Sequence, residues 1–273
     1  MLGAIVYRLR ALNSATLPLI NGRLMHAAFF KLLHEHAPKL EQSMHERTGL
    51  KPFTVSMLDP INEVQVDQYC LSVKRFDEFY WRLTSLDVDL IREIMTMPSG
   101  QPIRAGDLIL SLEEVIAKGR RDCRVISRAD FIGRIKANTP TTEMTFHFVS
   151  PTTFRIDDRD APYPKPELIF ASLADKWTQA DMPALIDKQL IKEMASSAVL
   201  TMWSGQSRSI YFGKDRGTLA FWGEFRFNIE RMEPTVRRVF ELLARFAEYS
   251  GTGRLAAQGF GQTRMSFKKT NTL

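Results

Sequence analysis

The sequence Gly251-Thr-Gly253-Arg-Leu-Ala-Ala-Gln-Gly259-Phe-Gly261 places four glycines within eleven residues near the end of the chain. A helical pattern over residues 235–249 precedes this glycine loop, and a strand pattern over residues 260–267 follows it. Glycine adopts positive φ angles at little cost and lets the backbone approach a ligand closely, so that exposed N–H groups can hold phosphate oxygens. The residues alone leave a second interpretation open, in which the glycines close a tight turn and cap the helix.

The charge around the glycine loop favours a phosphate backbone as its ligand. Residues 251–273 contain no acid, and their basic residues are Arg254, Arg264, Lys268 and Lys269. The loop is no P-loop, because no Gly-Lys-Ser/Thr follows, and no dinucleotide fingerprint, because it precedes a strand rather than opening a helix. We therefore predict a phosphate-binding loop.

The first half of the chain shows the order strand, helix, strand, strand, helix, strand, which is typical of the ferredoxin-like arrangement. The predicted strands cover residues 3–12, 53–58, 66–73 and 107–115, and the predicted helices cover residues 21–36, 38–47 and 77–95. A second pass begins near Phe131, with strands around 142–148, 154, 210–212 and 218–228 and helices at Pro166–Gln179 and 235–249. We predict an α+β protein with two such domains in tandem, residues 1–128 and 129–273.

The glycine loop resembles the C-terminal motif of the CRISPR repeat-processing endoribonucleases of the RAMP superfamily, Gly-h-Gly, five residues, Gly-h-Gly, where h is usually apolar. Thr252 is a mild departure from it. Similar segments run through most of the chain: Pro38 to Glu46 with Lys51 to Ser56, Val149 to Phe154, and Pro166 to Phe170. The resemblance implies two tandem ferredoxin-like domains and RNA as the ligand. Its expected RNA-binding residues here are Gly251, Gly253, Arg254, Gly259, Gly261 and Arg264, with Arg155, Lys214 and Arg216 as further candidates.

The resemblance also implies a reaction. Members of the family cut repeat RNA without metal, by attack of a 2′-hydroxyl on the adjacent phosphate, which gives 2′,3′-cyclic phosphate and 5′-hydroxyl ends. Such a reaction needs a base, an acid and positive charge near the developing phosphorane. His45 matches the family's frequent catalytic histidine, and Lys51 matches a lysine that supports the transition state.

The second proton-transfer group is less certain from the sequence. Some family members pair the histidine with a helix tyrosine, but the corresponding residue here is Phe30, which cannot transfer a proton. His26 and His34 lie four residues on either side of Phe30 and therefore share one helix face with it. Either imidazole can replace the missing hydroxyl; alternatively, both are polar-edge residues of an amphipathic helix.

Composition limits the remaining classes. The net charge is +6 and the pI is about 9.4, which favours a polyanionic partner. Cys70 and Cys123 are too few for a disulfide scaffold or a four-cysteine zinc site, and no signal peptide or membrane span is evident, so we expect a cytoplasmic protein. We also expect no metal and no cofactor, because a zinc site built from His34, His36 and His45 would lack a further ligand.

Three functions are consistent with these features. The first is an endoribonuclease that cuts CRISPR precursor RNA within its repeats and releases guide RNAs. The second is a non-catalytic RAMP subunit that holds guide RNA in an effector complex through the same loop. The third is a general RNA-binding module. The sequence leaves open whether the chain joins effector-complex proteins or forms a homodimer.

Overall fold

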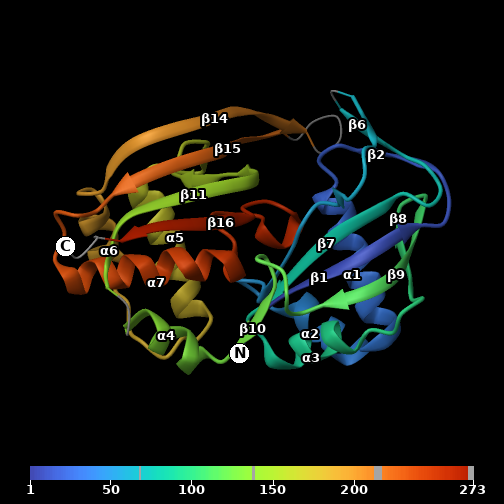
Figure 1. Ribbon diagram of the computed structural model, residues 1–273, viewed down its shortest axis with the longest axis horizontal. Helices are drawn as coiled ribbons and strands as arrows, with labels where there is room; N and C mark the ends of the chain where they lie inside the picture. The colour runs from blue at the N-terminus through green and yellow to red at the C-terminus, as the bar shows by residue number, and fades with distance from the viewer. Residues whose placement is uncertain (68, 137–138, 212–216, 270–273) are drawn as a thin grey trace. The chain divides into compact units, whose positions relative to one another are not determined.

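The computed structural model describes residues 1–67, 69–136, 139–211 and 217–269 (Figure 1). The chain forms two compact units. The N-terminal unit consists of Met1–Ile126 together with the short segment Ala257–Gly259, and the C-terminal unit consists of Ser127–Ala256 and Phe260–Leu273. The middle of the glycine loop therefore belongs to the N-terminal unit, although both of its flanks belong to the other.

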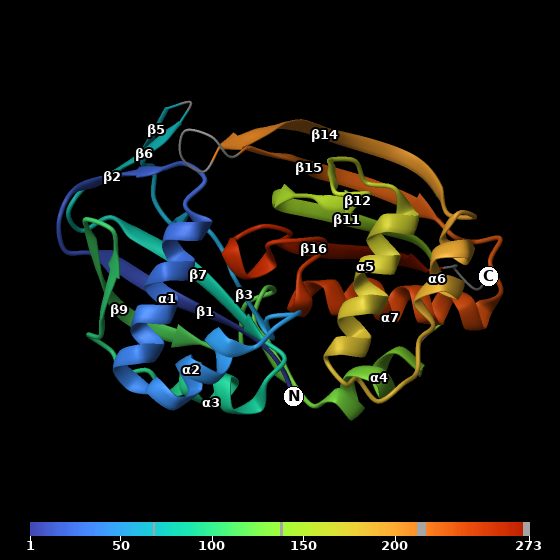
Figure 2. The same cartoon turned by 180° about the vertical axis from the view of Figure 1, so that it is seen from behind.

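The N-terminal unit is built on β1 (Leu2–Ala11), which pairs antiparallel with β7 (Glu78–Ser85) on one side and β9 (Leu108–Ile116) on the other. The sheet continues through β3 (Phe53–Val55) beyond β7 and through β8 (Pro102–Ala105) beyond β9. Helices α1 (Gly22–His36), α2 (Pro38–Glu46) and α3 (Val88–Thr96) lie on one face of this sheet (Figure 2). Buried side chains of α1 and α3, including Phe29 and Ile94, complete the core.

Shorter strands complete this unit. β10 (Arg124–Ile126) pairs with β1, and β4 (Asp59–Pro60) pairs with β7. A separate three-stranded sheet has the order β2 (Ala15–Pro18), β6 (Cys70–Val73), β5 (Gln65–Val66). The prediction of a single strand at residues 66–73 within the main sheet was therefore wrong, because these residues pair with β2 instead.

The predicted helix at residues 77–95 is a second correction. Residues Glu78–Ser85 form strand β7, and a helix begins only at Val88. Phe79, Leu83, Leu86 and Leu90 fit a helical spacing, but Phe79, Trp81 and Leu83 fit the alternation of a strand equally well and are all fully buried. Pairing of β7 with both β1 and β3 decides between the two patterns. Asp87 then caps α3, because its carboxylate accepts hydrogen bonds from the N–H groups of Asp89 and Leu90.

The C-terminal unit repeats the same plan. Its sheet has the order β14 (Val199–Tyr211), β15 (Gly217–Asn228), β11 (Thr141–Thr152), β16 (Thr263–Lys269), with all neighbours antiparallel. Helices α5 (Pro166–Gln179) and α7 (Pro234–Ser250) cover one face of the sheet (Figure 2). The ring of Phe170 joins the layers, since it lies 5.7 Å from Phe146 of the sheet and 4.4 Å from Phe240 of α7.

Three elements of this unit were not predicted: the helices α4 (Arg128–Lys136) and α6 (Lys188–Ala195) and the strand β13 (Arg159–Ala161). β13 forms a small hairpin with β12 (Phe154–Ile156), which lies where a strand was predicted around Phe154. A 3-10 turn, η1 (Ala256–Gln258), lies inside the glycine loop. Among the helices of the described ranges, none is long and apolar enough to cross a membrane.

Both units have the ferredoxin-like strand order. In the N-terminal unit the elements β1, α1, β3, β7, α3 and β9 give the spatial order β3-β7-β1-β9. In the C-terminal unit β11, α5, β14, β15, α7 and β16 give β14-β15-β11-β16. Each order places the first and third strands side by side in the centre of the sheet. The predicted fold class is confirmed.

Candidate active site and glycine loop

Helices α1 and α2 bring two of the predicted histidines around one phenylalanine. His26 and Phe30 are one turn apart on α1, and their ring centroids are 4.8 Å apart. The Phe30 ring also lies 5.8 Å from that of His45 on α2, edge to face. Pro38 at the first turn of α2 ends the preceding helix and starts the new one, which brings His45 back towards α1. The resulting cluster contains two imidazoles that flank a side chain without a proton to transfer.

His26 is held in one tautomer. Its Nδ1 lies 2.7 Å from the carbonyl oxygen of Ala257. Because a carbonyl only accepts, Nδ1 carries the proton and Nε2 keeps its lone pair. Burial against the Phe53 ring, which is stacked at 6.0 Å, lowers the pKa of His26, and the positive charge of Lys51 lowers the pKa further, although the Ala257 hydrogen bond acts in the opposite direction. His26 is therefore suited to accept a proton at neutral pH.

Lys51 anchors the C-terminal end of α2. Its Nζ donates to the carbonyl oxygens of Met44, His45 and Arg47 at 2.8, 2.9 and 2.7 Å. These three bonds use all three N–H groups of the ammonium and satisfy carbonyls at the C-terminal end of α2. Lys51 thus fixes the backbone that carries His45, and its charge reaches His26 through space.

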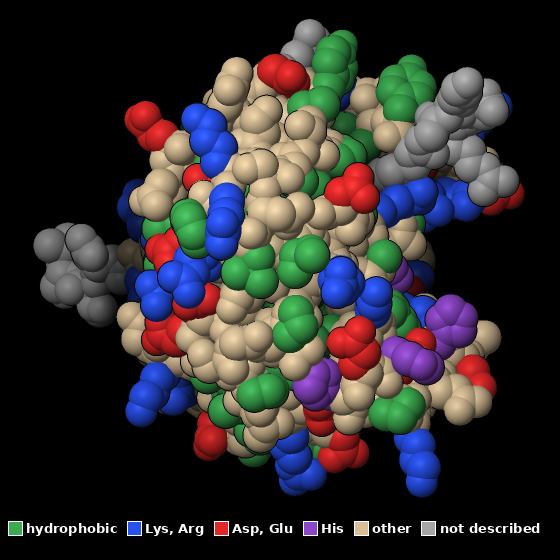
Figure 3. Space-filling model, turned by 90° about the vertical axis from the view of Figure 1, so that its right-hand side faces the viewer, with side chains coloured by type: hydrophobic (Ala, Val, Ile, Leu, Met, Phe, Trp, Pro, Cys, Tyr) green, Lys and Arg blue, Asp and Glu red, His purple; other side chains and the backbone are tan. Residues whose placement is uncertain are grey.

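His34 does not join this cluster by any contact that the structure records among the described residues. Its side chain is 73% exposed and forms an ion pair with Glu41 of α2 at 3.5 Å. Exposed histidines of α1 and α2 nonetheless lie near one another, and Figure 3 shows imidazoles gathered on one side of the N-terminal unit's surface with cationic and acidic side chains between them.

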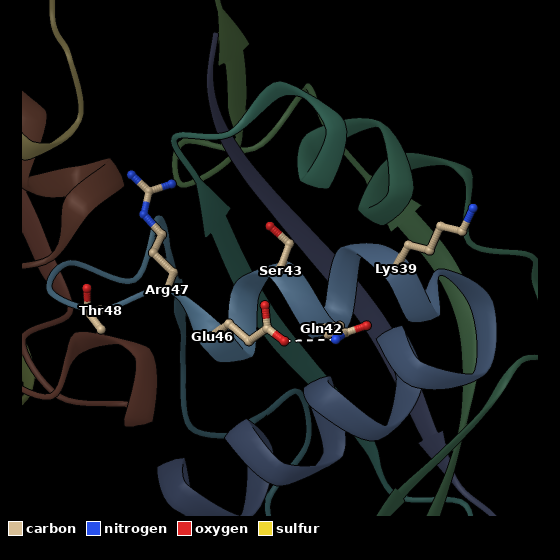
Figure 4. A pocket seen from close by; sticks show the side chains of 6 residues that line it. All are labelled: Lys39, Gln42, Ser43, Glu46, Arg47 and Thr48. Carbon is tan, nitrogen blue, oxygen red and sulfur yellow. Dashed lines mark hydrogen bonds between the residues drawn. The ribbon is translucent and has the colours of Figure 1, made fainter.

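An open hollow of about 770 Å³ lies beside α2 and the residues that follow it (Figure 4). Its lining residues are Lys39, Gln42, Ser43, Glu46, Arg47 and Thr48, and Gln42 donates to Glu46 across it at 2.8 Å. Glu41 and His45 face α1 from another side of the same helix. The hollow is lined by side chains of both charges and by no histidine.

The glycine loop is a packed structure and not an exposed one. Gly251, Gly253, Gly259 and Gly261 are all buried and all have positive φ, between 63° and 87°. A Cβ at Gly253 would meet the oxygen of Thr153 at 2.3 Å, and one at Gly261 would meet the oxygen of Thr252 at 2.0 Å. Only glycine fits these positions, because backbone passes directly over them.

The N–H groups of the loop serve its own structure. Gly251 donates to Ala247, Gly253 donates to the Ser172 hydroxyl, and Gly261 donates to Pro151. The expectation that these three N–H groups are available to phosphate oxygens was therefore wrong, and the alternative of a tight, capped turn describes them better. The reason is that a loop buried on both sides must satisfy its backbone internally.

The predicted basic residues are placed as follows. Arg254 lies 3.2 Å from the Asp160 carboxylate and its side chain is 37% exposed. Arg264 is exposed on β16, directly opposite His147 of β11. Arg155 forms an ion pair with Asp158 at 3.0 Å, whereas Lys214 and Arg216 lie outside the described residues.

The middle of the loop packs on the start of α1. A Cβ at Gly22 would meet the oxygen of Gln258 at 2.4 Å and Cα of Gly259 at 2.6 Å, and a Cβ at Gly259 would meet Cα of Gly22 at 2.5 Å. The neighbouring Arg23 donates from Nε to the Gln258 side chain at 2.9 Å. This glycine-to-glycine contact brings the Ala257 carbonyl to His26.

Two family models match the chain. The model of the CRISPR-associated endoribonuclease Cas6 matches residues 146–263, and that of the CRISPR Cas6 N-terminal domain matches residues 3–101. Together they cover most of both units. The chain belongs to the Cas6 family. The match to the N-terminal domain model includes His26, Phe30 and His45, and the other match includes the whole glycine loop.

Relatives and solved structures agree with this family assignment. A CRISPR-associated endoribonuclease Cas6 from Mycobacterium tuberculosis is 29% identical over 129 residues, which are 47% of this chain and 40% of that protein. Cas6 from Thermus thermophilus superposes with a TM-score of 0.73 at 24% identity, covering 97% of this chain and 98% of its own. A Cas6 product complex gives a TM-score of 0.76 at 24% identity and covers 97% and 99%. At these identities the structural likeness shows the fold.

Within this Cas6 fold, the structure brings together His26, His45 and Lys51 of the predicted catalytic residues and leaves His34 at the surface. Sequence reasoning missed Gly22 and the Ala257 carbonyl. A glycine directly after Asn21, at the start of a helical pattern, was the signal for the first. No pattern could have indicated the second, because a main-chain oxygen has no sequence signature.

Proposed function

We propose that this chain is a metal-independent endoribonuclease that cuts CRISPR precursor RNA within its repeats. The observation that carries the proposal is the cluster of His26 and His45 around Phe30. The Nδ1 proton of His26 is bonded to the Ala257 carbonyl, so its Nε2 carries the lone pair. A base and an acid from histidines are the groups that cleavage by a neighbouring 2′-hydroxyl requires.

His26 acts as the base in this mechanism. Its Nε2 takes the proton of the 2′-hydroxyl as that oxygen attacks the adjacent phosphorus, and its lowered pKa keeps the ring neutral before the reaction. The bond to Ala257 both fixes the tautomer and stabilises the imidazolium that forms, because the carbonyl dipole faces the Nδ1 proton.

His45 acts as the acid, and Lys51 supports it. His45 gives a proton to the departing 5′-oxygen, so that the P–O5′ bond breaks and a 2′,3′-cyclic phosphate and a 5′-hydroxyl are left. Lys51 holds the carbonyls of Met44, His45 and Arg47 and supplies positive charge beside the reacting phosphate. His34 remains a reserve candidate, since it lies one turn from Phe30 on the same helix.

The glycine loop contributes to RNA binding by shape and charge. Its four glycines set the course of the backbone, and Arg254 and Arg264 supply cations along it. Arg254→Ala should weaken binding of repeat RNA and lower the dependence of log K on log salt by about one. An unchanged slope would mean that Arg254 does not contact phosphate.

Incubation with repeat RNA in EDTA tests the enzyme. We expect one cut in each repeat, with a cyclic-phosphate end. His45→Ala and His26→Ala should each lower single-turnover cleavage by about 10²–10⁴-fold with little loss of RNA affinity. His36→Ala, a matched control on α1 with His26, should cut normally. Tight binding without cutting would support the non-catalytic guide-RNA subunit, and equal binding of unrelated RNA would support a general RNA-binding module. If His45→Ala still cuts, the assignment of His45 fails and His34→Ala is the next variant.

A further inference from the structure

The side chain of Lys176 on α5 lies in the protein interior. Only 7% of its surface is exposed, and its Nζ donates to the carbonyl oxygens of Ser250 and Gly251 at 3.1 and 2.9 Å. These are the last residue of α7 and the first glycine of the loop. Burial lowers the pKa of Lys176 to about 7, with Asp175 acting weakly against it. Burying an ammonium group costs free energy, so a lysine at this position is expected only where its hydrogen bonds have a structural role.

The exit of the chain from α7 explains why a side-chain donor is needed. Gly251 has φ 63° and ψ 171°, a conformation that is essentially restricted to glycine and that differs from the left-handed helical cap. Helices that end in the left-handed cap satisfy their last carbonyls with following backbone N–H groups. Here the carbonyls of Ser250 and Gly251 accept hydrogen bonds from the ammonium of Lys176. The helix dipole also favours a cation at this end of α7.

Ser172 lies one turn before Lys176 on the same face of α5. Its Oγ accepts a hydrogen bond from the N–H of Gly253 at 3.1 Å. The two α5 side chains therefore hold the loop at Gly251 and at Gly253, on either side of Thr252. Asp175, which lies between them in the sequence, forms an ion pair with Lys188 of α6 at 3.4 Å and is not part of this contact with the loop.

We propose that Ser172 and Lys176 form a two-point clamp, here called the α5 clamp, that positions the glycine loop for RNA without touching RNA. Lys176 is buried behind the loop backbone, so it acts through Gly251 and is a positioning residue. Arg254 directly follows the clamped Gly253, and its own N–H donates to the carbonyl oxygen of Thr153 at 2.9 Å. The clamp therefore helps to fix the position from which the Arg254 side chain leaves the loop. The inference rests on the proposed binding of RNA by the glycine loop.

Salt dependence separates positioning from direct contact. A lysine that neutralises a phosphate contributes about one to the slope of log K against log salt, whereas a buried lysine contributes nothing. Lys176→Met removes the ammonium but keeps an unbranched chain of similar length. Lys192→Met on α6, which is exposed, removes the same charge and leaves the loop untouched.

Binding of repeat RNA by the full chain is measured between about 50 and 200 mM salt. Lys176→Met should weaken binding about tenfold with the wild-type slope, because a charge-assisted bond that fixes the loop is lost. Lys192→Met should change the affinity less than about twofold. Ser172→Ala should also weaken binding at constant slope, and Ser172→Thr, which keeps the hydroxyl, should bind as the wild type does.

Hydrogen exchange provides a readout that needs no RNA. The amides of Gly253 and Arg254 should exchange faster in Lys176→Met and Ser172→Ala, and at the wild-type rate in Lys192→Met and Ser172→Thr. Wild-type affinity and exchange in Lys176→Met would overturn the clamp, and so would a salt slope that falls by one. If Lys176→Met does not fold, the Ser172 pair decides the question. If the wild-type chain does not bind repeat RNA but the variants show the expected exchange rates, the proposed function is refuted. The hydrogen bonds of Ser172 and Lys176 would still be shown to hold the loop.

Discussion

Replacing Gly22 by alanine tests the contact between α1 and the middle of the glycine loop. The new methyl group would lie 2.4 Å from the Gln258 oxygen and 2.6 Å from Cα of Gly259. Both are main-chain atoms, which cannot rotate away. Since carbon atoms normally pack at about 3.5–4.0 Å, residues 257–259 must move by roughly 1 Å.

The stability change follows from two opposing effects. Alanine is favoured over glycine inside a helix by up to about 1 kcal/mol. Overpacking against rigid backbone costs about 1–3 kcal/mol, and the displaced Ala257 carbonyl weakens its bond to His26, which is worth about 1 kcal/mol. The costs exceed the gain. We expect Gly22→Ala to lower the free energy of unfolding by about 1–3 kcal/mol and the melting temperature by several degrees.

Catalysis should suffer more than stability. A displacement of about 1 Å in a positioning group can cost roughly 10²-fold in rate, and His26 without its fixed tautomer presents the wrong nitrogen part of the time. Single-turnover cleavage measures the first effect, and ¹⁵N shifts of the His26 ring measure the second. We expect cleavage to fall about 100-fold while RNA affinity falls much less.

Gly133→Ala is the matched control for this experiment. Gly133 is an exposed residue of α4 with nothing within 4 Å of an added Cβ. This variant should be more stable than the wild type by about 0.5–1 kcal/mol and cut normally. If Gly22→Ala behaves like Gly133→Ala in both assays, the contact between Gly22 and Gly259 has no role in holding His26, and the reasoning fails.

Three further predictions follow from the charged groups. Because the pKa of His26 is lowered, cleavage should decline on acidification only below the ordinary histidine value of about 6.5, and His26→Ala should remove that limb of the pH–rate profile. The folded pKa of Lys176, about 7, is below its value of 10.5 in the unfolded chain, so the unfolded state binds more protons between these values. Urea unfolding should therefore show stability rising by about 1.4 kcal/mol per pH unit above pH 7, and Lys176→Met should abolish the rise. Lys51→Met should lower stability by about 1–2 kcal/mol and also slow cleavage, whereas loss of stability alone would limit Lys51 to capping α2.

Local patterns of the sequence were sufficient for much of the fold. Helices α1, α5 and α7 begin and end within a residue or so of their predicted bounds. Pro166 and Pro234 open α5 and α7, and Gly251 follows the last residue of α7, so these boundaries are set by local signals. Residues 77–95 could not be assigned in this way. Their apolar side chains satisfy both periodicities, and only pairing with β1 and β3 selects the strand.

By itself, the sequence indicated two tandem ferredoxin-like domains, although it misplaced the third strand of the first, and it fixed the Cas6-type spacing of the glycine loop and the closeness of His45 and Lys51. These features depend on spacing along the chain. Tertiary structure decided what those residues do. It buried the glycine N–H groups, directed Lys51 to the carbonyls of α2, and brought Ala257 to His26 across 231 residues of sequence. Close approach of backbone to backbone makes these contacts, and such an approach depends on the packing of distant segments, which no local pattern encodes.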